Sequence, residues 1–93
     1  MLKLLTMKVL MFYRPNSEHS RMVETYLRDF QKSHPSQLIT VVNVDSPRGT
    51  SLVELYDVVQ YPSIVVTDDN GVMQKLWLGE PLPLMDEVAS YLL

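Results

Sequence analysis

The sequence contains no cysteine, and this absence excludes a whole class of chemistry. Without a thiol the chain can form no disulfide, carry out no thiol–disulfide exchange and build no cysteine-containing metal site. Small domains without disulfides are usually intracellular, so we expect a cytoplasmic protein. Long apolar runs are also missing, and no stretch approaches the roughly 20 apolar residues of a transmembrane helix. We therefore expect no membrane partner.

Histidine and positive charge are scarce as well. The chain has two histidines, a net charge of −3 and no basic run, so it lacks the electrostatic footprint of a nucleic-acid-binding protein. His19, His34 and the acidic residues show no ligand spacing, so we expect neither a metal nor a cofactor. A chain of 93 residues is too short for two independent cores. We predict one domain over residues 1–93, in which residues 1–7 lead into the first strand.

The apolar patterns predict the element order βαβαββα. Strands are expected over residues 8–13, 38–44, 63–67 and 72–78, with helices over about 17–32, from residue 50 or 51 to about 59, and over about 84–92. The first two strands are joined through a helix, which favours a parallel pair. The last two are joined by a tight Asn70-Gly71 turn, which requires an antiparallel pair. The predicted fold class is α/β, a four-stranded mixed sheet with helices on both faces.

Local signals also predict where the helices begin. Asn16 or Ser17 can cap the first helix. Ser51 and Glu54 have the spacing of a capping box for the second helix. The residues of that helix expected to face the core are Leu52, Leu55, Tyr56 and Val59.

Two segments resemble the motifs of one known superfamily. Residues 12–21, Phe-Tyr-Arg-Pro-Asn-Ser-Glu-His-Ser-Arg, resemble a strand, a proline-containing loop and a C-x-x-C motif whose cysteine positions fall on Ser17 and Ser20. Residues 56–63, Tyr-Asp-Val-Val-Gln-Tyr-Pro-Ser, resemble a Y-G-V-x-x-x-P-T segment in which the proline is cis. On these motifs the chain is similar to the thioredoxin and glutaredoxin superfamily. It resembles a degenerate member with Ser-x-x-Ser in place of Cys-x-x-Cys, and the thioredoxin-like fold is expected.

The resemblance implies a binding site in which no thiol takes part. In the superfamily, the residue before the cis-proline presents its backbone to an extended peptide or to glutathione, and such contacts do not need the cysteines. The leading hypothesis is a non-catalytic module, monomeric or weakly dimeric, that binds a protein or peptide. The alternatives are a glutathione- or small-molecule-binding enzyme without thiol chemistry, and a structural homodimer that pairs through an edge strand. The candidate binding residues are Ser17, His19, Ser20, Tyr61, Pro62 and Ser63, and Trp77 is a candidate interface residue.

A serine nucleophile with a histidine base is disfavoured by the spacing of these residues. Ser17 and His19 are two residues apart, so on a helix their side chains point in different directions. No acidic residue is obviously placed to orient His19, as a catalytic triad requires. A second origin for the serines stays open, because engineered replacement of two cysteines would give the same sequence.

Overall fold

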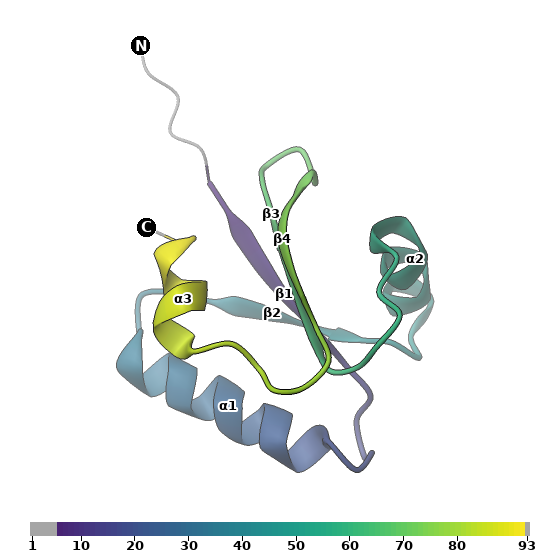
Figure 1. Ribbon diagram of the computed structural model, residues 1–93, viewed down its shortest axis with the longest axis horizontal. Helices are drawn as coiled ribbons and strands as arrows, with labels where there is room; N and C mark the ends of the chain where they lie inside the picture. The colour runs from purple at the N-terminus through teal and green to yellow at the C-terminus, as the bar shows by residue number, and fades with distance from the viewer. Residues whose placement is uncertain (1–5, 93) are drawn as a thin grey trace.

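A mixed sheet with helices on both faces forms the part of the chain described by the computed structural model, residues 6–92 (Figure 1). The predicted order βαβαββα and the predicted fold class are confirmed. Of the predicted leader, residues 1–5 lie outside the described residues. The elements are β1 (Lys8–Tyr13), α1 (Ser20–Ser33), β2 (Ile39–Asn43), α2 (Pro47–Tyr56), β3 (Ser63–Thr67), β4 (Met73–Leu78) and α3 (Met85–Ser90).

The strand order in the sheet is β2-β1-β3-β4. β1 and β2 run parallel, as expected for strands joined through a helix, with Val9 opposite Ile39. β3 pairs antiparallel with both β1 and β4, and the turn containing Gly71 joins it to β4. β2 and β4 are therefore the two edges of the sheet.

Two apolar clusters hold the helices against the sheet. Successive residues of β1 point to opposite faces, so Val9 and Met11 enter one cluster and Leu10 and Phe12 enter the other. α1 and α3 cover the first face and α2 covers the second (Figure 1). The helix residues in the first cluster include Val23, Phe30, Val88 and Ala89, and those packed against the second include Leu52, Val53 and Tyr56.

The first helix begins later than the capping signals predict. α1 starts at Ser20, and His19 occupies the N-cap position without a side-chain hydrogen bond to the helix. The predicted cap at Asn16 or Ser17 is wrong. Asn16 adopts a left-handed φ of 60°, and the Ser17 hydroxyl donates to the Arg14 carbonyl at 2.6 Å. Hydroxyls readily satisfy nearby backbone groups, and here Ser17 closes a turn before the helix instead of capping it.

The second helix begins earlier than predicted. α2 starts at Pro47, and the Ser46 hydroxyl accepts a hydrogen bond from the Gly49 N–H at 2.9 Å. Proline suits the first helical position because an N–H there would have no acceptor within the helix, so nothing is lost when it is absent. The predicted capping box at Ser51 is wrong, since Ser51 lies inside the helix and donates to the Pro47 carbonyl.

The shifted start of α2 also changes which residues face the core. Leu55 and Val59 were expected to point inward, but each is 68% exposed. Val53 packs against the core instead, and Val58, just after the helix, is buried. The physical reason is that the helix turns its Leu52–Val53–Tyr56 stripe to the sheet and leaves Leu55 on the opposite side.

Candidate functional site

Three loops meet at one end of the sheet. β1 ends at Tyr13, and in the sheet register its neighbour Phe12 lies opposite Ser63, the first residue of β3. Ser63 in turn lies opposite Leu78, the last residue of β4. Because antiparallel neighbours reverse direction, the loop after β1, the loop before β3 and the loop after β4 all start or end here. We call residues 14–20, 59–63 and 78–79 the loop surface.

The two serines that occupy the cysteine positions are connected by a tight turn. The Ser20 N–H donates to the Ser17 carbonyl at 3.2 Å, and the Ser20 hydroxyl donates to the same oxygen at 2.9 Å. The His19 ring accepts the Arg14 N–H on its Nε2 at 3.1 Å. The hydroxyls of Ser17 and Ser20 therefore both donate to backbone carbonyls. The Nε2 atom of His19 already accepts a hydrogen bond from the Arg14 N–H. The arrangement does not form a serine–histidine nucleophile.

Arg14 links this turn to two other parts of the sheet end. Its guanidinium contacts both carboxylate oxygens of Asp45, just after β2, at 2.9 and 3.1 Å. It also lies 5.6 Å from the centre of the Tyr61 ring, within the range of a cation–π contact. The hydrogen bonds and the charge of Asp45 raise the pKa of Arg14. The sequence interpretation missed this residue, because partners 31 positions apart leave no local signal.

Tyr13, the last residue of β1, contacts both the turn and α1. Its ring lies 6.2 Å from the His19 ring in an edge-to-face arrangement, and its hydroxyl donates to Glu24 of α1 at 3.2 Å. Burial, with a smaller contribution from the Glu24 carboxylate, raises the pKa of Tyr13. The end of β1 and the start of α1 are therefore held together by an aromatic pair and a hydrogen bond.

The segment before β3 combines two buried residues with a backbone that has few hydrogen bonds. The Tyr61–Pro62 peptide bond is cis, and Pro62 and Ser63 are buried. The Ser63 hydroxyl donates to the Gln60 carbonyl at 2.6 Å and accepts the Gly79 N–H at 3.2 Å. Ser63 thereby joins two of the loops from inside. Within residues 6–92, no hydrogen bond is found to the N–H or the carbonyl of Tyr61.

Gly79 is the point where the loop after β4 approaches the loop before β3. Its φ is +69°, and a Cβ atom there would overlap the side-chain oxygen of Gln60. The positive φ favours glycine, because other residues rarely adopt this conformation, whereas the end of the Gln60 side chain could move aside. A substitution at Gly79 would therefore strain the backbone of the loop after β4.

Trp77, the candidate interface residue, lies on the edge strand β4. Its ring packs edge-to-face against Tyr91 at 5.7 Å, and the Lys75 ammonium lies 5.6 Å from its centre. The side chain is half-buried in the cluster under α1 and α3. An interface role for Trp77 stays a prediction.

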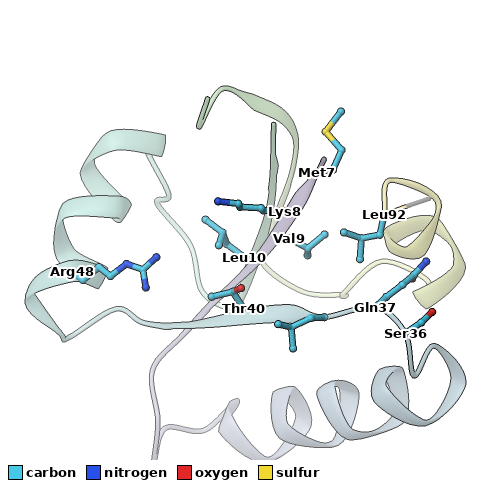
Figure 2. A pocket seen from close by; sticks show the side chains of 10 residues that line it. Met7, Lys8, Val9, Leu10, Ser36, Gln37, Thr40, Arg48 and Leu92 are labelled. Carbon is cyan, nitrogen blue, oxygen red and sulfur yellow. The ribbon is translucent and has the colours of Figure 1, made fainter. Parts of the chain in front are cut away.

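Three cavities lie away from the loop surface. A cavity of about 420 Å³ opens near the starts of β1 and β2, at the opposite end of the sheet, and is lined in part by Lys8, Thr40 and Arg48 (Figure 2). A second, of about 500 Å³, lies between α1 and the chain leading into α3, and a third, of about 320 Å³, lies beside the β3–β4 turn. None of the three is lined by a residue of the loop surface.

Comparison with solved structures identifies the architecture. The chain matches mitochondrial thioredoxin 3 of Saccharomyces cerevisiae with a TM-score of 0.68 and 16% identity, over 92% of this chain and 76% of that one. It matches thioredoxin O1 of Arabidopsis thaliana with a TM-score of 0.72 and 13% identity, over 94% and 78%. The chain has the thioredoxin fold. The germline-specific thioredoxin Deadhead of Drosophila is also similar, with a TM-score of 0.69 and 19% identity, over 91% and 76%. No protein-family model and no curated protein matches the sequence.

This thioredoxin fold lacks the residues for thiol chemistry. Ser17 and Ser20 stand where the resemblance places the cysteines, and the chain contains no cysteine elsewhere. Among residues 6–92 there is also no group of three or more histidines and carboxylates close enough to hold a metal ion. No helix in this part of the chain is long and apolar enough to cross a membrane.

Proposed function

We propose that this chain is a redox-inactive thioredoxin-fold domain that binds an extended protein or peptide segment at its loop surface. The observation that carries the proposal is the backbone of Tyr61, whose N–H and carbonyl have no hydrogen-bond partner within the described residues. An extended peptide can supply both missing partners, as in other cases of recognition by strand addition. We also propose a cytoplasmic location, because small domains without disulfides are usually intracellular.

Exposed apolar side chains beside this backbone support the proposal. Val59 is 68% exposed and precedes Tyr61 by two residues, while Leu78, 41% exposed, lies opposite Ser63 in the sheet. Backbone hydrogen bonds give affinity to an extended ligand, and neighbouring apolar positions select its side chains. Arg14 contacts both Tyr61 and Asp45, so it connects the loop before β3 with the segment after β2.

The positions of the three cavities favour a peptide over a small molecule at the loop surface. Sites for small ligands are concave and enclose most of the ligand. The three cavities described above all lie elsewhere. A protein or peptide ligand needs no enclosed cavity, so the binding module is preferred to the enzyme that would bind glutathione or another small molecule.

The proposal can be tested with peptides selected on the purified protein from a random phage-displayed library. Titrating a selected peptide into the isotope-labelled protein should shift the amide signals of residues 17–20 and of Gln60, Tyr61 and Ser63. Val59→Asp should weaken binding by about tenfold or more, a loss of roughly 1.4 kcal/mol. Leu55→Asp is a matched control, because Leu55 is equally exposed but lies on α2. Peptides that shift amides elsewhere, or that lose affinity equally in both variants, would contradict the proposal.

A further inference from the structure

The cavity at the starts of β1 and β2 lies at the end of the sheet opposite the loop surface (Figure 2). Its volume of about 420 Å³ is within the range of sites for small molecules. No residue of the loop surface lines it. A ligand in this cavity is therefore independent of the peptide proposed above.

Two cationic side chains line this cavity from different elements. Lys8 is the first residue of β1, and Arg48 lies in the first turn of α2. Figure 2 shows their charged ends directed toward one another, with Leu10 and Thr40 beside them. Within residues 6–92 neither cation forms an ion pair. An anionic group placed between them can contact both, and the Thr40 hydroxyl can donate a hydrogen bond to it.

Two carboxylates lie near the same cations but are not paired with them. Asp68 and Asp69, in the β3–β4 turn, line an adjoining cavity of about 320 Å³ that shares Lys8, Leu10 and Arg48 with the first. Asp68 accepts two backbone N–H groups of its own turn on Oδ1, and no ion pair involves either carboxylate in the part of the chain that the structure describes. Their charge disfavours a phosphate group, which carries about −1.5 to −2, more than a carboxylate with its single charge.

Apolar side chains form much of the remaining cavity wall. Val9, Leu38 and Leu92 are among them, and Leu38 is 70% exposed. An apolar ligand group that covers such a leucine removes apolar surface from water, which favours binding. A bare inorganic ion would leave this surface uncovered. The lining therefore fits a ligand that has one negative charge and an apolar body.

We propose that this cavity binds a small aliphatic carboxylate, with the carboxylate between Lys8 and Arg48 and the aliphatic chain against Leu38 and Leu92. The carboxylate accepts hydrogen bonds from both cations, and such charged hydrogen bonds are stronger than those between neutral groups. Because both cations are exposed to solvent, they contribute modestly to affinity, and burial of the aliphatic chain supplies the rest. A ligand this small binds weakly, so we expect dissociation constants in the millimolar range.

Titration of octanoate into the isotope-labelled full chain, followed by its amide signals, tests this proposal. We expect shifts at residues 8–10, 37–40 and 48 and none at residues 17–20 or Tyr61, so that this proposal and the peptide proposal succeed or fail separately. Octanamide, which has the same chain length without the charge, should bind about tenfold more weakly. Affinity should increase from butyrate through hexanoate to octanoate, because each added CH₂ buries more apolar surface.

Two variants each remove one of the cations. Lys8→Met and Arg48→Met should each weaken octanoate binding about threefold, and the double variant about tenfold. Arg28→Met is a matched control, because it removes the same charge from an exposed position on α1 that lines none of the three cavities. Unchanged amide signals outside the cavity show that each variant keeps its fold.

Three results would each overturn the proposal. The first is that octanoate at about 20 mM, well above a millimolar dissociation constant, shifts no amide of the cavity. The second is that octanamide binds as tightly as octanoate, or that affinity does not depend on chain length. The third is that Arg28→Met weakens binding as much as Arg48→Met does.

Discussion

Restoring cysteines at positions 17 and 20 should create a disulfide in this chain. The Ser20 N–H and hydroxyl both bond the Ser17 carbonyl, so the two residues are held in one turn. Residues three apart in a helical turn have Cβ atoms about 5–6 Å apart, and a disulfide needs about 3.5–4.5 Å. A small adjustment of this exposed loop is sufficient. We expect Ser17→Cys/Ser20→Cys to close within one molecule under mild oxidation.

The expected stabilisation follows from the size of the closed loop. A disulfide across about four residues removes chain entropy worth about 1.9 kcal/mol at 25 °C. For a domain of this size, 1 kcal/mol corresponds to a shift of roughly 4–8 °C in Tm. The oxidised double variant should therefore melt up to roughly 8–15 °C above its reduced form, less any strain in the bond. Circular dichroism melts with and without a reductant give the difference, and thiol titration reports closure.

Single variants provide the controls and a second readout. A thiol at position 17 lies just before α1, whose first N–H groups lack acceptors within the helix, so its pKa should fall below that of a free thiol. Ser51→Cys, exposed inside α2, should show no such decrease. The alignment of Ser17 and Ser20 with a cysteine pair is refuted if the double variant stays reduced or cross-links only between molecules. Equal thiol pKa values at positions 17 and 51 would refute the helix argument.

Three further predictions concern the unmodified chain and two of its residues. The purified protein should not reduce insulin disulfides above background in a turbidity assay, because it has no thiol, and clear turnover would disprove this. Gly49→Ala should lower the free energy of unfolding, measured in urea, by about 1–3 kcal/mol, because the new Cβ would overlap the Asn43 carbonyl. Unchanged stability would contradict this and show that α2 can shift away from Asn43. Burial, aided by Glu87, raises the pKa of Tyr26 to about 12. The unfolded phenol titrates near 10, so this contribution to stability should be complete below pH 10 and lost toward pH 12. Tyr26→Phe should remove that pH dependence, and identical profiles would contradict the assignment.

The order of the elements could be predicted from the sequence because it depends on local patterns. The apolar run of β1 indicated a strand covered on both faces, and both apolar clusters use it. The Asn70-Gly71 turn indicated the β3–β4 hairpin, and the connection through α1 indicated a parallel pair. Chain stiffness, handedness and side-chain period act over a few residues, so one sequence contains this information.

Helix starts were less predictable because several residues competed for the same role. Ser17 and Ser51 both have the chemistry of a helix cap, yet one closes the turn before α1 and the other lies within α2. Ser46 occupies the N-cap position of α2, and Pro47, which follows it, is favoured at the first helical position. Which of these serines caps a helix depends on where the preceding strand, β1 or β2, ends in the sheet.

The composition by itself determined that this thioredoxin fold performs no thiol chemistry, since the missing atoms cannot be supplied by any arrangement of the others. Only the tertiary structure decided how the loop surface is assembled. Arg14 meets Asp45 and Tyr61 because β1 lies between β2 and β3 at the centre of the sheet. Lys8 and Arg48 likewise line one cavity because α2 follows β2, which lies beside β1 in the sheet. Contacts between distant parts of a chain follow from the order of the strands in the sheet, and a short run of residues does not contain that order.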